Sequence, residues 1–323
     1  MPLTGQGGTI MSNKISSIVE SYLEYKRNLG FQLIGEAYFL RAFARYTEEI
    51  NYIGSLTREI VFQWCESGDN PSLTTKGRRF EPLKGLADYA SSFDQDSELL
   101  PKLPYGNPHK RKRPHIYTID ETCLLMEKSN SLYSPDGLRA LSIHTAIGLL
   151  WATGLRISEL VNLKTSDVDF NNRILIIQNS KFNKDRIVPV LPTVNEQLSL
   201  YRKKVEAMSP IPIETDSFFI TTNGAALKAN ALEYAFQRIR DCVDPGSSEY
   251  EHVRLYDFRH TFATRTIAKW LEQNEDVNAK LFLLSTYMGH NHPEDTFWYL
   301  SSTPELMSLF SNKYEQMFGG ESR

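Results

Sequence analysis

The chain has 323 residues, of which 41% are hydrophobic and 23% charged, and its formal net charge is −3. This length can accommodate two domains with separate hydrophobic cores, and the charge neither indicates nor excludes a polyanionic partner. No apolar run is long enough to span a bilayer, and residues 1–12 lack the pattern of a secretory signal, so we expect an unstructured leader on a cytoplasmic protein without a membrane partner. The three cysteines are scattered, which favours reduced thiols over a metal cluster.

Residues 13–100 carry apolar side chains at helical spacing. Turn residues separate the periodic segments, and Gly30 is placed to end the first of them. The predicted helices cover residues 13–30, 36–50, 57–65 and 76–92. This stretch is therefore expected to form a small domain made of helices alone.

Residues 101–114 form a proline-rich linker, because prolines at four positions prevent a continuous helix. The linker contains four consecutive cations, Lys110, Arg111, Lys112 and Arg113. Such a run is either a solvated surface or a contact that follows the phosphates of DNA. Its sequence alone leaves both interpretations open.

Residues 115–323 mix helical and strand periodicity and are expected to form a second domain. Thr118 and Glu121 are spaced as a capping box, which predicts a helix start, and Ser158 is placed to cap a later helix. The other predicted helices cover 138–152, 194–207, 228–240, 256–271, 277–288 and 304–318. Alternating apolar residues predict a β-hairpin with strands at 173–177 and 186–190, and a third short strand at 218–221. The fold class is thus mainly α with a small β-hairpin.

Four separated groups of polar residues lie beside these apolar elements. They are centred on Arg156, on Lys181 in the hairpin turn, on Tyr256 with Arg259, and on His290 with Tyr299 nine residues later. Arg156 occupies a glycine turn at the start of a helix, where a guanidinium and the helix N-terminal amides together suit a phosphate.

Each group alone also has an ordinary structural explanation. A hairpin lysine is usually solvated, and the two aromatic residues Trp298 and Tyr299 could simply pack. Arg259 could form an ion pair with Asp257 or Glu159. The order and combination of the four groups carry more information than any single one.

In that order the groups resemble the tyrosine recombinase (phage integrase) family of site-specific DNA recombinases. The family pattern is an arginine in a TGLRxSEL turn, a lysine in a following hairpin, an HxxR motif, and GH with a tyrosine nine residues on. This chain has Thr153-Gly154-Leu155-Arg156, Lys181, Arg259, Gly289-His290 and Tyr299. The resemblance covers about residues 115–312, while the preceding helical segment fits the family's core-binding domain by size and type only. The residues around Tyr299 look like those of transposon-associated members.

The resemblance implies that Tyr299 attacks the scissile phosphodiester and forms a 3′-phosphotyrosyl enzyme. Arg156 and Arg259 would stabilise the charge on the phosphate oxygens in the transition state. Lys181 would protonate the leaving 5′-oxygen, and His290 would add a hydrogen-bond donor. This chemistry requires no metal or other cofactor.

Tyr256 departs from the family pattern, because the first position of HxxR is usually histidine. A phenol can still donate a hydrogen bond to a phosphate oxygen. It accepts a proton less readily than imidazole does. His260, next to Arg259, is expected to point about 100° further round the helix, so the role is not transferred to it. Because of Tyr256, an alternative remains in which this chain has lost its catalytic activity.

Double-stranded DNA and four protomers are the partners that the resemblance implies, since two strand exchanges pass through a four-way junction. It also implies a two-domain clamp around DNA, and the final helix could pack on its own domain or on a neighbour. The residues expected to contact DNA are Lys110, Arg111, Lys112, Arg113, Lys184 and Arg186. The alternatives are a type IB topoisomerase and a non-catalytic DNA-binding accessory protein descended from a recombinase.

Overall fold

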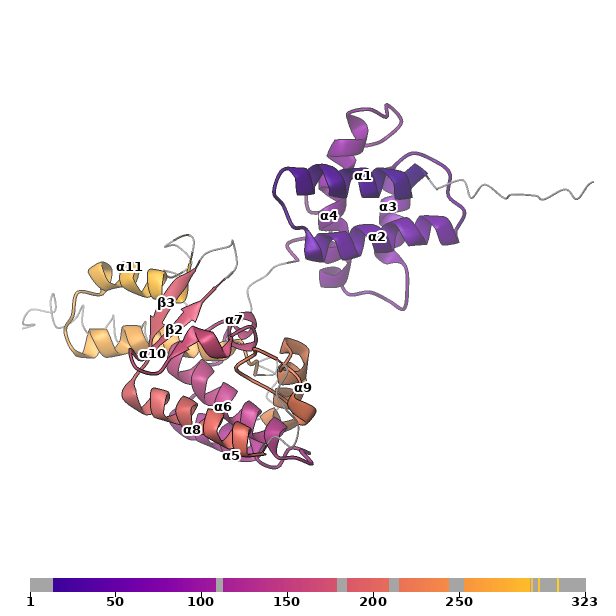
Figure 1. Ribbon diagram of the computed structural model, residues 1–323. Helices are drawn as coiled ribbons and strands as arrows, with labels where there is room; N and C mark the ends of the chain where they lie inside the picture. Colours follow the sequence, from indigo (N-terminus) through magenta and orange to yellow (C-terminus); the bar gives the residue numbers. More distant parts are fainter. Residues whose placement is uncertain are drawn as a thin grey trace, which may run out of the picture. The chain divides into compact units, whose positions relative to one another are not determined.

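The computed structural model describes residues 14–108, 113–178, 185–208, 215–243 and 253–290, together with His292, Thr296 and Met307. The chain divides into two compact units, Met1–Lys112 and Arg113–Arg323 (Figure 1). None of the described helices is both long and apolar enough to cross a membrane.

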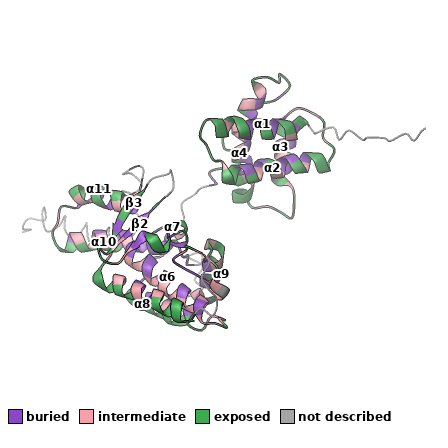
Figure 2. Cartoon of the chain, viewed as in Figure 1, coloured by how far each residue is buried: buried purple, intermediate pink, exposed green. Residues whose placement is uncertain are grey.

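The N-terminal unit contains four helices within its described part. They are α1 (Lys14–Asn28), α2 (Ile34–Glu49), α3 (Arg58–Glu66) and α4 (Leu73–Ser91). Leu23, Leu40 and Phe43 are fully buried between them, and the outward faces of the helices are exposed (Figure 2). Helix α4 begins before the predicted position because the Ser72 hydroxyl accepts a hydrogen bond from the Thr75 amide at 3.2 Å and caps the helix there.

The C-terminal unit has one central helix, α6 (Leu138–Thr153). It packs against α5 (Ile119–Ser129), α8 (Pro192–Met208) and α10 (Asp257–Glu272). Helix α6 is apolar on most sides, as a helix enclosed by neighbours must be. The remaining described helices are α7 (Ile157–Val161), α9 (Ala229–Ile239) and α11 (Val277–Met288), with 3₁₀ turns at Thr165–Asp167, Thr222–Gly224 and Arg240–Cys242. The predicted capping box of α5 is confirmed, since Thr118 and Glu121 hydrogen-bond each other's backbone amides.

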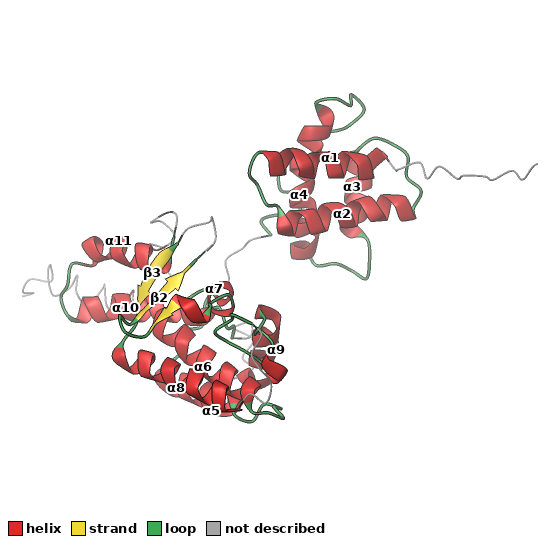
Figure 3. Ribbon diagram, in the orientation of Figure 1, coloured by secondary structure: helices red, strands yellow, loops and turns green. Residues whose placement is uncertain are grey.

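The C-terminal unit also has a three-stranded antiparallel sheet in the order β1 (Val168–Asp169), β2 (Ile174–Ile177) and β3 (Arg186–Pro189). Figure 3 shows β2 and β3 beside the helices. The β2–β3 hairpin agrees with the prediction, but the prediction of a strand at 218–221 is wrong. There, Ile220 forms only an isolated bridge with Ala226. Phe218, Phe219 and Ile220 are all fully buried, but their backbone hydrogen bonds go to separate segments: the Phe218 amide donates to Leu163 O at 2.7 Å, and Phe219 O accepts from the Leu227 amide at 3.0 Å. No continuous ladder of hydrogen bonds forms along the described stretch.

The register of the hairpin determines which side chains face the core. Ile177 pairs with Arg186 and Leu175 with Val188. Val188 is fully buried, while Ile187 on the opposite face is 61% exposed. Because side chains alternate along a strand, Arg186 points to the same side as Val188. The strand thus carries an arginine into the interior.

Two helices of the C-terminal unit end on glycines in the left-handed region, Gly154 after α6 with φ 62° and Gly289 after α11 with φ 66°. A Cβ atom at Gly154 would lie 2.7 Å from a ring carbon of Phe262, and one at Gly289 would lie 2.9 Å from Arg186 Nη1. Both backbone conformation and space therefore require glycine. These are the glycines of the TGLR and GH motifs.

Candidate active site

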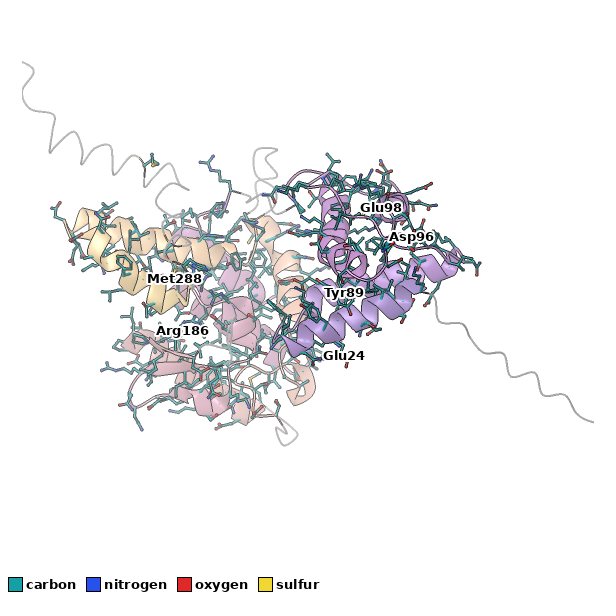
Figure 4. The ribbon with its side chains drawn as sticks, turned by 90° about the horizontal axis from the view of Figure 1, so that it is seen from above. Glu24, Tyr89, Asp96, Glu98, Arg186 and Met288 are labelled. Atoms are coloured by element: carbon teal, nitrogen blue, oxygen red, sulfur yellow. The ribbon has the colours of Figure 1, made fainter. Side chains whose placement is uncertain are left out.

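The last turn of α11 is the centre of the site, because three successive carbonyl oxygens there accept hydrogen bonds from three arginines. Arg186 Nε donates to Tyr287 O at 2.9 Å, Arg259 Nη2 to Met288 O at 2.5 Å, and Arg156 Nη2 to Gly289 O at 2.8 Å. The final carbonyls of a helix have no partner within the helix and carry its negative partial charge. A guanidinium group both donates the missing hydrogen bonds and carries a positive charge that attracts the negative end of the helix. Arg186, on β3, and Met288, on α11, are labelled in Figure 4.

The backbone around Gly289 completes this turn. The amide of Gly289 donates to Thr286 O and the amide of His290 to Ser285 O, each at 3.0 Å, which is the hydrogen-bond pattern of a Schellman motif. His290 Nδ1 lies 2.7 Å from the hydroxyl of Thr296, a residue that is fully buried. The backbone position of His290 and the orientation of its ring are therefore both fixed.

Glu159 joins two of the three arginines. Its Oε1 accepts from Arg156 Nη1 at 2.7 Å and from Arg186 Nη1 at 2.8 Å, and its Oε2 accepts from Arg186 Nη2 at 2.7 Å. Oε2 also accepts the backbone amide of Arg156 at 2.9 Å. Burial alone would raise the pKa of Glu159, but the hydrogen bonds and charges of Arg186 and Arg156 outweigh it and lower the pKa to about 2. The carboxylate is thus ionised at neutral pH.

The same contacts explain where α7 begins. Ser158 was the predicted N-cap, and that prediction is wrong, since the N-cap is Arg156 and the helix begins at Ile157. Glu159, in the first turn, accepts the Arg156 amide as the acid of a capping box does. The guanidinium of Arg156 is therefore directed toward Gly289. Of the Arg156 side chain, 17% remains exposed.

Arg259 connects the ends of α6 and α11. Its Nη1 donates to Gly154 O at 2.7 Å and its Nη2 to Met288 O, and the residue is 1% exposed. The carboxylates that the sequence offered as ion-pair partners are engaged elsewhere. Glu159 holds Arg156 and Arg186, and Asp257 accepts from Arg254 Nη2 at 2.7 Å.

Tyr256 lies at the N-cap of α10 and is 43% exposed. Its ring makes an edge-to-face contact with His260, with 5.2 Å between the ring centroids. Residues four apart on a helix are neighbours, so the two rings share one face of α10. The phenol therefore meets solvent, one helical turn from an imidazole.

The structure brings Arg156, Arg259 and His290 together, with Tyr256 three residues before Arg259. Lys181, Lys184, Tyr299, Lys110, Arg111 and Lys112 lie outside the described residues. Arg113 is exposed at the start of the C-terminal unit. Arg186, expected to contact DNA, is instead turned into the protein, and 10% of its side chain is exposed. Among the described residues, no group of three or more His, Cys, Asp or Glu side chains is placed to hold a metal ion.

The sequence pattern around Arg186 is consistent with its inward position. In the strand Arg186-Ile187-Val188, the period of two places Arg186 and Val188 on one face. The partnership of Glu159 with Arg186 had no comparable signal, since 27 positions separate the two residues.

Solved structures with this fold include DNA recombinases. The chain resembles the XerH site-specific recombinase bound to its palindromic difH substrate, with a TM-score of 0.61 and 20% identity, over 92% of this chain and 84% of that one. It also resembles the Tn1549 transposon integrase in complex with circular intermediate DNA, with a TM-score of 0.62 and 19% identity, over 92% and 99% of the two chains. At these identities the similarity concerns the fold.

The sequence comparisons define the family. The model of the phage integrase family matches residues 117–305. Two putative integrase/recombinases of Sinorhizobium fredii are 30% and 31% identical, over 94% and 92% of this chain and 97% and 96% of their own lengths. The tyrosine recombinase XerC of Staphylococcus carnosus is 26% identical over 75% of each chain. The chain belongs to the phage integrase family.

Proposed function

We propose that this protein is a site-specific DNA recombinase that cuts and rejoins double-stranded DNA through a 3′-phosphotyrosyl intermediate on Tyr299. The observation that carries the proposal is the arrangement of three arginines on the last turn of α11. That turn brings Arg156, Arg259 and His290 together, and Tyr299 follows nine residues after His290 in the sequence. Membership of the phage integrase family supports the same reaction.

Arg156 is the arginine best placed to receive a scissile phosphate. A guanidinium has five N–H donors in a planar fork, so Arg156 can hold Glu159 and Gly289 and still donate to a non-bridging oxygen. Its orientation is set before DNA arrives, because both of these partners are fixed within the protein. Such preorganised charge stabilises the pentavalent transition state without further rearrangement.

Arg259 would serve the second non-bridging oxygen. It is 1% exposed, so a phosphate reaches it only if the atoms that cover it move aside when DNA binds. The proposal therefore includes a local rearrangement near Gly154 and Met288, the two residues whose carbonyls Arg259 holds.

The remaining roles complete an in-line displacement at phosphorus. The phenol oxygen of Tyr299 forms the new bond to phosphorus, its proton passes to solvent or a nearby base, and the bond to the 5′-oxygen breaks. Lys181 gives a proton to that leaving oxygen, and His290 donates to the phosphate. Tyr256 adds a hydrogen bond from its exposed phenol.

The architecture of the complex follows from the same proposal. The N-terminal unit acts as a core-binding domain and forms a clamp around DNA with the C-terminal unit, while the basic linker follows the phosphate backbone. Four protomers assemble on two duplexes. We also assign a transposon-type mobile element as the substrate and the cytoplasm as the location, where such DNA is found.

A trapping experiment tests the nucleophile. The Tyr299→Phe variant, which retains the proposed DNA contacts, is used to select a binding site from a pool of random duplexes. That site is then synthesised with a nick just beyond the scissile phosphate, so that cleavage releases a short fragment and the reaction cannot reverse. Wild-type protein is expected to form a covalent adduct that survives denaturing electrophoresis, and Tyr299→Phe to form none.

The outcomes separate the proposed recombinase from its rivals. An adduct that persists in Tyr299→Phe would show that another residue is the nucleophile. Selective binding without any wild-type adduct would support a non-catalytic accessory protein. Relaxation of supercoiled plasmid without strand exchange between two cognate sites would support a topoisomerase.

A further inference from the structure

We propose that Arg186 is a positioning residue of the active site: it fixes the base of the β2–β3 hairpin so that Lys181 can protonate the leaving 5′-oxygen, and it does not bind DNA. This inference rests on the proposed function. It replaces the sequence-based expectation that Arg186 contacts a phosphate.

The contacts of Arg186 use all three nitrogens of its guanidinium group. Nη1 and Nη2 donate to the two oxygens of Glu159 at 2.8 and 2.7 Å, and Nε donates to Tyr287 O at 2.9 Å. The side chain of Glu159 is 2% exposed. A phosphate contact by Arg186 would leave this carboxylate buried with fewer partners, which is unfavourable. The geometry therefore favours an internal role.

Arg186 is the first residue of β3, at the end of the hairpin that is next to the connection. Its backbone pairs with Ile177, and among the described residues this is the hairpin pair nearest to the connection at 178–185. Lys181 lies in that connection, five positions before Arg186 in the sequence. The five positions of chain between them limit how far Lys181 can lie from the strand end at Arg186. Arg186 thus fixes the end of β3 next to the connection that contains Lys181, the proposed general acid.

The groups that accept hydrogen bonds from Arg186, the Glu159 carboxylate and the Tyr287 carbonyl, also lie next to other residues of the active site. Glu159 Oε1 also accepts from Arg156 Nη1, and Tyr287 lies two positions before Gly289 of the GH motif. Gly289 lies against the same guanidinium, since a Cβ there would come within 2.9 Å of Nη1. The Arg186 side chain therefore connects the hairpin to α7, which follows Arg156, and to α11, which precedes His290.

The test compares Arg186→Gln with Lys184→Gln, which removes one positive charge from the same hairpin. Binding of the selected duplex is measured over a range of salt concentrations, and cleavage of the nicked substrate is measured at saturating protein. We expect Arg186→Gln to keep the wild-type Kd and salt dependence and to cleave about 100-fold more slowly. Lys184→Gln is expected to weaken binding and to reduce the salt slope by roughly one.

A modified substrate distinguishes positioning of Lys181 from general destabilisation. When sulfur replaces the bridging 5′-oxygen, the leaving group departs as a thiolate and needs no proton. We expect this substrate to restore cleavage by Arg186→Gln and by Lys181→Ala to within a few-fold of the wild-type rate. Arg186→Lys, which keeps the charge but not the planar fork, is expected to cleave oxygen substrate at an intermediate rate and provides the variant to use if Arg186→Gln does not fold.

Three results would overturn the inference: a salt slope reduced by about one in Arg186→Gln, cleavage at the wild-type rate, or no recovery with the sulfur substrate. These are distinct from a failure of the proposed function. If wild-type protein forms no Tyr299 adduct at all, the recombinase assignment fails before the comparison of variants begins.

Discussion

Replacing Glu159 by glutamine tests how strongly the arginine cluster depends on one buried charge. Glutamine keeps the shape of the side chain but removes the charge that Arg156 and Arg186 share. The pKa of Glu159 is lowered from 4.5 to about 2 in the folded protein. At about 1.4 kcal/mol for each pKa unit, the ionised carboxylate contributes roughly 3 kcal/mol to the free energy of unfolding.

The pH dependence of this contribution has a defined sign. Because the folded-state pKa is below the unfolded-state value, the stabilisation is fully present above about pH 4.5. It is lost as the pH falls from there toward about 2, where the folded protein also takes up the proton. Wild-type protein and Glu159→Gln should therefore differ most at neutral pH and converge in acid.

The assay is urea unfolding at several pH values, followed by hydrogen exchange of the α6 amides. Helix α6 is the centre of the C-terminal unit, so its exchange reports that unit separately from the N-terminal one. Asp216→Asn is the control, since Asp216 pairs with Lys164 at the surface and its loss should leave the free energy of unfolding nearly unchanged. A difference between wild type and Glu159→Gln that stays constant from pH 7 to pH 2 would refute the charge-based reasoning.

Three other changes have definite expected outcomes. Gly289→Ala should lower the free energy of unfolding by at least about 1–2 kcal/mol, because its φ of 66° disfavours a side chain and the added Cβ would meet Arg186; unchanged urea unfolding would contradict this. Thr118→Ala should cost about 1 kcal/mol in the same measurement, because it removes the cap of α5, and Thr118→Ser should restore most of it. Tyr256→His should keep or increase the rate of adduct formation, since imidazole accepts a proton more readily than a phenol at this exposed position, and a large loss would mean that the phenol is specifically required.

Two features account for most of what could be read from the sequence: periodicity and motif order. Helical spacing located α1 to α4 and the long helices of the C-terminal unit, because burial of one face requires apolar residues at fixed intervals. The glycines of the TGLR and GH motifs marked the ends of α6 and α11, where only glycine adopts the required backbone conformation without strain. The order of the motifs indicates Arg156, Arg259 and His290, and the fold brings them to one turn.

What only the tertiary structure decided is the partner of each charged side chain. The sequence allowed Arg259 to pair with Glu159 and assigned Arg186 to DNA. In the folded chain Glu159, on α7, instead holds Arg186, which lies 27 positions later on β3. Arg259 donates to the carbonyls that end two helices. Periodicity specifies which face of an element is buried, but hydrogen bonds between distant residues depend on how the elements pack. The unpaired carbonyls at the end of α11 attract whichever cations the fold brings there, and here it brings three arginines.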